Sequence, residues 1–494
     1  TTGGKMSQPP LWNHQQVGIE RAINSANFAF FFEMGTGKSR TLIEVLRHHY
    51  NTHRRICRTL ILCPKIVIDN WPEEFQKYSK IPLDRLVLIR GTAAQRERAW
   101  ARGMEKHRGN FIAITNYDKL VDNRMENGKK VNRSDVFRKL MLWEPEILVL
   151  DESHKAKDLK AERTKAVLRL ALPATNPSIK HKYILSGTPV LRDPTDLFSQ
   201  FLILDGGATF GKEFWPFKLN VMVDKNAAFK GKPNYFPKWE MRPGALNDVH
   251  TKMQVRSMSV KKEECLDLPP LVRERRYVEM TAPQKKAYEE MRKHLITFIE
   301  NKAVSADLAL TKALRLLQIA SGFAQTEEKV RISFKDTPKM EALRESLEDL
   351  TPNHKVIVWA VFHENYAQIR KVCNDLGLKY LEIHGQASDH EKQTAAKRFR
   401  EESDIRVVIG HPGSGGIGIS LVSASYSIFY SRGFSFGDDA QAEARNHRGG
   451  SEIHERVTRI DLVTKGTIEE AVLKRLELKQ AISDSLLRDI LFEE

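Results

Sequence analysis

The chain has 494 residues, which exceeds what one hydrophobic core commonly supports, so two domains are expected. Hydrophobic residues make up 41% and charged residues 29%, and no apolar run approaches the roughly 20 residues that span a bilayer, so we expect no membrane partner. The formal charge of +16 suits a polyanionic partner such as nucleic acid. Four cysteines without a CxxC pair predict neither a zinc site nor a disulfide framework, and they indicate reduced thiols.

The first half of the chain alternates short apolar runs with helical patterns. Each run ends in small or polar residues, as buried strands of a parallel sheet do. The predicted strands cover residues 28–32, 59–62, 111–115, 147–150 and 182–185. This alternation predicts an α/β domain whose parallel sheet carries helices on both faces.

The second half repeats the pattern, with strands predicted at residues 356–360, 380–383, 406–409 and 427–430. Between the halves, the charged sequence KKEECLDLPP ends in two prolines and indicates a junction. We therefore predict a tail, a first lobe, a linker, a second lobe with a helical insertion near its start, and a C-terminal helix, at residues 1–10, 11–255, 256–275, 276–480 and 481–494.

The sequence MGTGKSR directly follows a predicted strand and precedes a predicted helix. Glycines at 35 and 37 let backbone N–H groups turn toward phosphates, and the helix N-terminus adds the positive end of its dipole. Lys38 is positioned to reach the β and γ phosphates, and the Ser39 hydroxyl to ligate Mg²⁺. We assign a nucleotide site to Gly35, Thr36, Gly37, Lys38, Ser39 and Arg40.

The sequence DESH follows the strand ILVL, so Asp151 and Glu152 are expected at the carboxyl edge of the sheet, where ligands bind. We predict that Asp151 holds Mg²⁺ and that Glu152 orients or deprotonates the attacking water. A solvated acidic turn is the alternative for either residue alone. The order of the two motifs favours the catalytic interpretation.

Contact with a nucleic-acid backbone needs loop amides, hydroxyls and lysines near a sheet edge, rather than groups that read bases. Lys65, Thr115, Tyr117 and Ser414 are the candidates. No base-reading motif is present in the sequence, so binding is expected to be largely independent of base sequence.

Taken together, the motifs resemble those of Swi/Snf-like superfamily 2 helicases and DNA translocases. The resemblance extends over residues 11–480 through HQQVG, ILCPKIVIDNW, ITNYD, DESHKAKD, LSGTP, GSGGIGISL, QAEARNHRGG and TKGTIEE. It implies two tandem RecA-like lobes with an ATP cleft between them, and ATP and Mg²⁺ as cofactors. The departure FSFGDD, where the family commonly has Trp-Asn-Pro, is similar to compact phage or mobile-element members.

The same resemblance implies roles for further residues. Gln15 is the expected adenine reader, and Gly418 and Gln441 are expected near the nucleotide. Arg445 and Arg448 are the expected arginine fingers, supplied by the second lobe to nucleotide held by the first. Gln441, Arg445 and Arg448 are also predicted to share one face of a helix.

The predicted activity is ATP-driven movement along double-stranded DNA by a monomer, with remodelling of DNA or protein–DNA complexes and a recruiting protein as a further partner. A strand-separating or branch-migrating helicase, an RNA-directed motor and a DNA-binding scaffold with little ATPase activity are the alternatives. The expected compartment is the cytoplasm of a bacterial or phage-infected cell, or the nucleus of a eukaryote.

Overall fold

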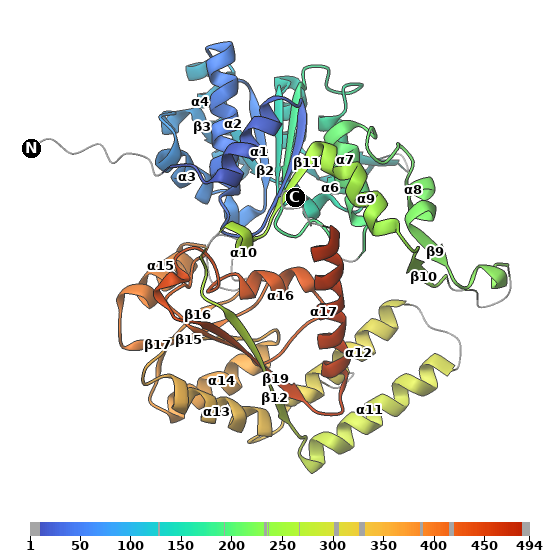
Figure 1. The fold of residues 1–494 in the computed structure, drawn as a ribbon, viewed down its shortest axis with the longest axis vertical. Helices are drawn as coiled ribbons and strands as arrows, with labels where there is room; N and C mark the ends of the chain where they lie inside the picture. The colour runs from blue at the N-terminus through green and yellow to red at the C-terminus, as the bar shows by residue number, and fades with distance from the viewer. Residues whose placement is uncertain are drawn as a thin grey trace, which may run out of the picture. The chain divides into compact units, whose positions relative to one another are not determined.

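A computed structural model describes residues 10–126, 129–191, 193–231, 235, 237–265, 267–300, 306–325, 331–385, 389–413 and 419–486. The chain divides into two compact units, of which the second comprises residues 267–481. Each unit is built around its own parallel sheet (Figure 1). The α/β fold class expected from the alternating runs is therefore confirmed.

The sheet of the first unit has seven strands in the order β11-β1-β8-β7-β2-β4-β3, and every neighbouring pair is parallel. The strands are β1 (Asn27–Phe32), β2 (Thr59–Cys63), β3 (Leu86–Leu88), β4 (Ile112–Asn116), β7 (Ile147–Asp151), β8 (His181–Leu185) and β11 (Ser257–Val260). The helices are α1 (Asn13–Ile23), α2 (Lys38–His53), α3 (Asn70–Tyr78), α4 (Ala93–His107), α5 (Asp135–Trp143), α6 (Glu162–Ala171), α7 (Asp196–Asp205), α8 (Phe214–Val221), α9 (Ala245–Met253) and the short α10 (Lys262–Cys265). Two hairpins, β5 (Asn123–Glu126) with β6 (Lys129–Asn132) and β9 (Met222–Asp224) with β10 (Trp239–Met241), stand outside the sheet.

Strand β1 shows why this sheet is covered on both faces. Successive side chains of a strand point to opposite faces, and five consecutive residues of β1 are buried. Phe31 packs toward α7, with its ring 6.1 Å from that of Phe201. Phe32 packs toward α1, where a Cβ on Gly18 would lie 3.1 Å from its ring. Apolar side chains are therefore needed at every position, which is the pattern that the sequence displays.

The sheet of the second unit has six parallel strands in the order β12-β19-β18-β15-β17-β16. They are β12 (Leu271–Val278), β15 (Val356–Trp359), β16 (Lys379–Ile383), β17 (Ile405–Gly410), β18 (Tyr426–Phe429) and β19 (Val457–Thr464). The helices are α11 (Ala282–Glu300), α12 (Ala306–Ala320), α13 (Pro338–Leu350), α14 (His363–Asp375), α15 (Asp389–Glu401), α16 (Phe436–Glu443) and α17 (Ile468–Leu486), and β13 (Phe323–Gln325) pairs with β14 (Arg331–Ser333).

This second sheet also separates two apolar clusters. Val358 packs in a cluster with residues of α13 and α14, whereas its neighbour Trp359 packs with residues of α15 and α16. A Cβ on Gly410 would lie 2.5 Å from the Trp359 ring, so this glycine makes room for the indole. Helices α11 and α12, where the sequence predicted a helix-rich stretch, lie between β12 and α13 in the chain.

The segment predicted as a linker, residues 256–275, contains sheet strands at both ends. Strand β11 pairs in parallel with β1 of the first sheet, and β12 pairs in parallel with β19 of the second. In the described part of the chain, no helix is long and apolar enough to cross a membrane.

Glu146 lies directly before β7, at the amino end of the strand, whereas the phosphate loop follows the carboxyl end of β1. Its pKa is strongly lowered. The Arg55 guanidinium donates to it in a bidentate pair at 2.7 and 2.6 Å, and the Arg58 backbone N–H donates at 3.0 Å. These donors outweigh partial burial and lower the pKa of Glu146 to about 2.

Because the folded-state pKa of Glu146 is depressed, its stabilisation is present above about pH 4.5 and is lost as the pH falls toward about 2. We expect Glu146→Gln to lower the free energy of unfolding at pH 7 by about 1 to 2 kcal/mol, after allowance for solvent screening. Urea unfolding of both proteins at pH 7, 5 and 3 measures this. The difference should shrink toward pH 3, and a difference that is constant with pH would contradict the assignment.

Candidate active site

The phosphate loop joins the carboxyl end of β1 to the start of α2. Gly35 and Gly37 have φ of +87° and +84°, a backbone region that favours glycine. A Cβ on Gly37 would also lie 2.1 Å from the Gln15 amide nitrogen. Two positive-φ glycines ahead of a helix N-terminus form the concave backbone that accepts phosphate. This arrangement agrees with the geometry that MGTGKSR predicted.

Lys38 lies at the base of this loop. Its ammonium donates to the carbonyl oxygens of Phe32 and Glu33, at 2.8 and 3.1 Å. A Cβ on Gly187 would lie 3.4 Å from the same ammonium, so the LSGTP sequence passes beside the loop. Lysine is therefore held where a bound polyphosphate would meet it.

Helix α1 docks on the loop from the side. The Gln15 side chain is only 1% exposed, accepts from the Trp12 backbone N–H at 3.0 Å and donates to the Gly37 carbonyl at 3.4 Å. A His14 ring nitrogen lies 2.9 Å from the Thr36 carbonyl oxygen. The Arg40 side chain instead lies over the Tyr78 ring and donates to the Pro10 carbonyl.

The acidic pair lies at the carboxyl end of β7. Asp151 and Glu152 are both buried, and Glu152 adopts a positive φ of 52°, a conformation that costs energy for a residue with a side chain. Burial, together with the neighbouring charge of Glu152, raises the pKa of Asp151 to about 7, while the Lys38 charge opposes this shift. Two adjacent buried carboxyl groups fit a divalent cation, because such a cation stabilises their charged forms.

The donor set points to a particular kind of metal site. Among the described residues, no group of three or more His, Cys, Asp or Glu could hold a metal ion. Mg²⁺ is commonly held by one or two protein oxygens together with substrate phosphates and waters, rather than by a complete protein cage. The Ser39 hydroxyl and the Asp151 carboxylate fit that requirement.

His154 connects the acidic motif to LSGTP, and sequence reasoning gave it no role. Its Nδ1 lies 3.3 Å from a Glu152 carboxylate oxygen and 3.1 Å from the Ser186 hydroxyl, which accepts from the Thr188 backbone N–H. Burial lowers the pKa of His154 to about 3, so the ring is neutral. A neutral Nδ1 either donates to Glu152 or accepts from Ser186. A change in the hydrogen bonding of Glu152 can therefore change the hydrogen bond between His154 and Ser186.

Gln200 on α7 forms a second connection that the sequence did not reveal. Its amide oxygen accepts from the Ser153 hydroxyl at 2.6 Å, and its amide nitrogen donates to the carbonyls of Pro189 and Asp196 at 2.8 Å. One buried side chain thus joins the acidic motif, LSGTP and the helix that follows. The only sequence signal was the presence of polar residues in the otherwise apolar sequence DLFSQFLIL.

The four candidates for nucleic-acid contact differ in accessibility. Lys65 is exposed. Thr115 and Tyr117 are buried, and their hydroxyls donate to the carbonyls of Ile89 and Asp151 at 3.0 and 2.8 Å. Their side chains therefore belong to the lobe interior. Ser414, like the nucleotide-site candidate Gly418, falls outside the described residues.

The arginine-bearing sequence lies in the second unit, and its predicted helical face is wrong in one respect. Helix α16 includes Gln441 but ends at Glu443, so Arg445 and Arg448 lie in the turns that follow. The Arg445 carbonyl accepts from the Leu421 backbone N–H at 2.9 Å, and its guanidinium donates to the Ile419 carbonyl at 3.3 Å. These bonds attach the segment to Ile419 and Leu421, at the C-terminal end of the Gly-rich motif, and the helix does not continue.

A buried ion-pair network, formed by Arg432, Arg459, Asp439, Glu443 and Asp461, holds α16 against β18 and β19. Arg459 contacts all three carboxylates, at 2.7 to 3.1 Å. Arg432 pairs with Asp439 at 2.6 Å and also with Asp461. Burial opposes the charge of Arg459, but the three carboxylates outweigh it and raise its pKa. The sequence FSFGDD thus contributes Asp439 to the ion-pair network that precedes the arginine-bearing segment.

Comparison with known proteins agrees with these motifs. A family model for the SNF2-related domain matches residues 16–327, and one for the helicase conserved C-terminal domain matches residues 338–450. The chain belongs to the SNF2-related family.

Several relatives of this SNF2-related chain are known. It is 25% identical to the TATA-binding protein-associated factor mot1 of Aspergillus fumigatus, over 92% of this chain and 25% of that protein. It is 25% identical to an uncharacterized ATP-dependent helicase of Mycoplasma pneumoniae, over 98% of this chain and 43% of that protein. It is 22% identical to the Saccharomyces cerevisiae DNA repair and recombination protein RDH54, over 87% and 45%. The chain thus spans between a quarter and about half of the length of these relatives.

Among solved structures, the Sulfolobus solfataricus SWI2/SNF2 ATPase core in complex with dsDNA is similar at 20% identity and a TM-score of 0.42, covering 97% of this chain and 93% of that one.

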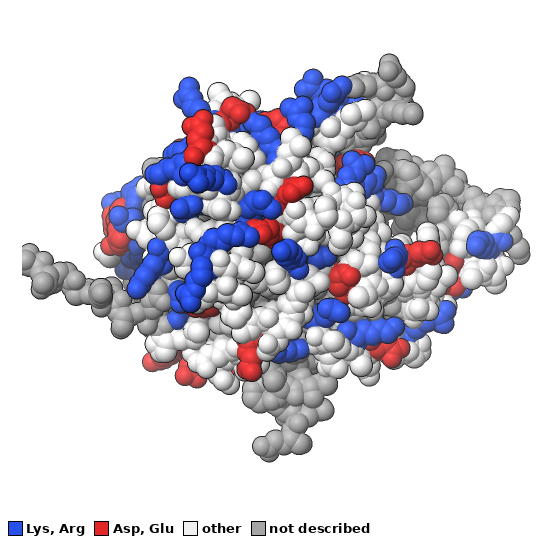
Figure 2. Space-filling view, turned by 90° about the horizontal axis from the view of Figure 1, so that it is seen from above, with Lys and Arg blue, Asp and Glu red and all other residues white. Residues whose placement is uncertain are grey.

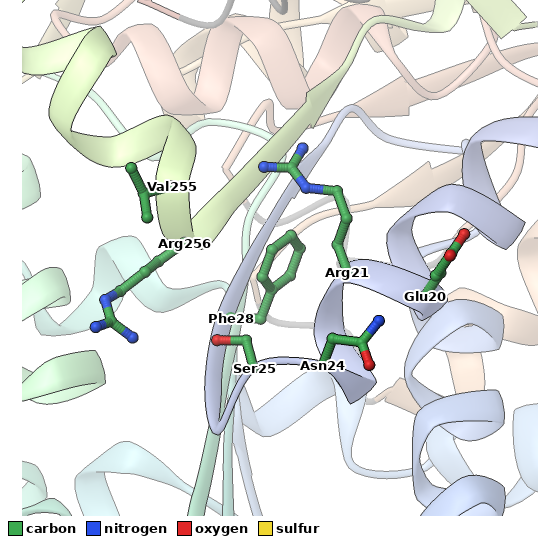
Figure 3. A pocket seen from close by; sticks show the side chains of 7 residues that line it. All are labelled: Glu20, Arg21, Asn24, Ser25, Phe28, Val255 and Arg256. Carbon is green, nitrogen blue, oxygen red and sulfur yellow. The ribbon is translucent and has the colours of Figure 1, made fainter.

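A small hollow lies away from this site in the first unit of the SNF2-related chain (Figure 3). It has a volume of about 430 Å³ and lies where α1 ends and β1 begins, with the Arg21 guanidinium 5.3 Å from the centre of the Phe28 ring. Because the phosphate loop follows the other end of β1, this hollow is separate from the nucleotide site.

Proposed function

We propose that this chain is an ATP-dependent translocase on double-stranded DNA that hydrolyses ATP between its two lobes. One observation carries the proposal: in a chain of the SNF2-related family, the phosphate loop, the acidic pair and LSGTP converge at one edge of a parallel sheet. That edge is where open α/β sheets bind ligands.

In this proposal, Gly35 to Ser39 hold the ATP phosphates and Gln15 lies toward the base. Ser39 and Asp151 hold Mg²⁺, which supplies charge neutralisation at the phosphates when bound. Glu152 accepts hydrogen bonds from the attacking water and takes its proton. The His154–Ser186 contact conveys the state of Glu152 to LSGTP, and Gln200 extends this connection to α7.

Arg445 and Arg448 complete the proposed site from the second lobe. Hydrolysis of the γ-phosphate develops charge that a guanidinium stabilises, so closure of the lobes would switch hydrolysis on. Repeated closure and opening on a DNA backbone would then move the chain, with Lys65 as a candidate backbone contact. A monomer suffices for this cycle, and a recruiting protein would choose its substrate.

The discriminating experiment measures the ATPase rate with no nucleic acid, single-stranded DNA, blunt duplex DNA and double-stranded RNA at equal nucleotide concentration. Strong stimulation by blunt duplex DNA, with displacement of a triplex strand, supports the translocase. Stimulation by single strands alone would favour a strand-separating helicase. Turnover at background level with every ligand would favour a scaffold.

We also expect the DNA-stimulated rate at subsaturating DNA to fall as salt rises. Phosphate contacts release counterions, so the logarithm of affinity falls with the logarithm of salt concentration by about 0.9 for each phosphate neutralised. Titrating duplex DNA at several potassium chloride concentrations gives this slope. A flat response would contradict contact with the phosphate backbone, and Lys65→Ala should reduce the slope by about one.

A further inference from the structure

The first unit contains a large basic pocket at the edge of its sheet opposite the phosphate loop. Its volume is about 1280 Å³, and among the residues that the structure describes no Asp or Glu lines it, whereas seven Lys and Arg do. Its basic residues are Arg47, Arg54, Arg55, Lys80, Arg85, Lys106 and Arg108. The face drawn in Figure 2 shows Lys and Arg side chains spread over the surface with acidic ones among them, so a hollow whose charged lining residues are Lys and Arg is a local concentration of positive charge.

The position of the pocket separates it from the nucleotide site. Arg54 caps the C-terminus of α2 just before β2, and Arg108 caps the C-terminus of α4 just before β4. Parallel strands begin at one edge of a sheet and end at the other, and the phosphate loop follows the end of β1. The pocket therefore lies at the amino ends of the strands, and the phosphate loop lies at their carboxyl ends.

Part of this positive charge is neutralised within the lobe. Arg55 pairs with Glu146, Arg47 with Glu44, and Lys106 with Asp84. Arg85 donates to the Asn110 carbonyl, which carries no net charge. Among the described residues, four pocket cations form no salt bridge with a carboxylate: Arg54, Lys80, Arg85 and Arg108.

The ends of α2 and α4 offer only partial compensation for Arg54 and Arg108. A helix C-terminus carries about half a negative charge, which is less than the full charge of a carboxylate partner. Both arginines adopt a positive φ, of 54° and 51°, at positions where helices often end in glycine. Local structure therefore favours a small residue at each position, and neither arginine is required there by the fold.

The pocket also has an apolar lining, which limits the kind of anion that fits. Ile43, Ile56, Ile81 and Pro82 lie among the cations, and of the Phe, Tyr and Trp residues that the structure describes, Tyr50 alone lines the pocket, with 46% of its surface exposed. Single-stranded nucleic acid is usually bound by stacking its bases on several aromatic rings. Duplex DNA presents phosphates on a convex rod without apolar side chains that could enter a hollow. An aliphatic floor under a basic rim instead complements a peptide that combines carboxylates with apolar side chains.

We propose that this pocket binds an acidic, apolar-anchored peptide segment of a partner protein, and that it is an interaction site separate from the ATP and DNA sites. The carboxylates pair with Arg54, Lys80, Arg85 and Arg108, and one or two apolar side chains contact the isoleucine floor. The lobe would thereby be recruited through the edge that its catalytic cycle does not use.

The test uses the full chain and a fluorescein-labelled peptide in which Asp and Glu alternate with Leu and Phe. A second peptide of the same charge carries Gly and Ser in place of Leu and Phe, and single-stranded and duplex oligonucleotides are the further probes. Fluorescence anisotropy at physiological salt should show the apolar acidic peptide binding at least about tenfold more tightly than the Gly/Ser peptide.

The variant Arg54→Glu/Lys80→Glu/Arg108→Glu should lose at least tenfold in affinity for the apolar acidic peptide. It should keep the DNA-independent ATPase rate, because the three side chains are exposed and lie away from the phosphate loop. The melting temperature is measured alongside, and it should fall only slightly, because two of the new carboxylates lie at helix C-termini. A matched control, Arg98→Glu/Arg102→Glu/Lys252→Glu, makes the same change in net charge at exposed positions outside the pocket and should stay within twofold of the unmodified chain. The single change Tyr50→Ala should weaken binding of the apolar acidic peptide and leave binding of the Gly/Ser peptide unchanged.

Three results would overturn the proposal. Equal loss in the pocket variant and the control would show that net charge governs binding. Loss of oligonucleotide binding in the pocket variant, without tighter binding of the apolar peptide, would assign the pocket to nucleic acid. Absence of binding by either peptide would remove the site. None of these results depends on whether the chain moves on DNA, so failure here and failure of the translocase proposal are distinguishable.

Discussion

Replacing Lys38 with Ala is expected to lower the DNA-stimulated ATPase rate at least a hundredfold, the scale on which loss of one preorganised charge at a transition state is felt. The lysine ammonium is held by two carbonyls at the base of the phosphate loop, at 2.8 and 3.1 Å. In the proposed reaction it moves to the β and γ phosphates, which bind it more strongly because they are charged. Alanine leaves those phosphates without this cation.

Steady-state ATP hydrolysis with saturating blunt duplex DNA measures this effect. Lys160→Ala, an exposed lysine in the same lobe, is the control and should keep the full rate. A thermal melt separates catalysis from folding, since the loop backbone keeps its glycines in the Lys38 variant. If the Lys38 variant retained more than a tenth of the rate while folded, the phosphate-loop assignment would be wrong.

Most interior strands of both sheets were predictable, because burial on two faces commonly requires apolar side chains at successive positions. Strand β1, with the sequence NFAFFF, packs toward α1 on one face and toward α7 on the other. The phosphate loop was predictable for a related reason: positive-φ positions before a helix strongly favour glycine, and glycine is visible in a sequence.

Strands β12 and β19 were not predicted, because charged residues interrupt their apolar pattern. In β19, Arg459 and Asp461 are buried, yet they read as surface residues in the sequence VTRIDLVT. Their charges are tolerated because Asp439 and Glu443, which are distant in the sequence, pair with Arg459. A buried network of this kind is a property of the fold and leaves no local pattern.

Site residues divided along the same line. The positive-φ turn at Gly37 and the position of Asp151 at the end of β7 could be predicted, because they follow from compact motifs. The contacts of His154 and Gln200 could not, because they form across 32 and 47 residues of sequence. Helical spacing wrongly placed Arg445 on a helix. Helix α16 ends at Glu443, and the Arg445 carbonyl accepts a hydrogen bond from the Leu421 backbone N–H.

Replacing Arg445 or Arg448 with Ala is expected to lower kcat by about a thousandfold or more while leaving nucleotide affinity within a few fold, as removal of an arginine finger does. Both side chains follow α16, which is anchored by Arg459 to Asp439 and Glu443. The segment that bears the two arginines therefore follows a helix held by ion pairs in the second lobe, whereas the phosphate loop that would hold ATP is in the first. Loss of the guanidinium should remove charge stabilisation in the transition state and spare ground-state binding.

Two measurements separate this role from a structural one. Binding of a fluorescent ATP analogue and of an ADP–aluminium fluoride complex should diverge, with only the second, a transition-state mimic, weakened in the Arg445 and Arg448 variants. Arg398→Ala removes an exposed arginine that pairs with Glu402 in the same lobe, and it should change neither value. Because Arg445 is 2% exposed, Arg445→Lys is included to keep a cation in place if alanine lowers the melting temperature. Loss of ground-state nucleotide affinity together with turnover would contradict the finger assignment, since groups that act only on the γ-phosphate charge of the transition state contribute little before it forms.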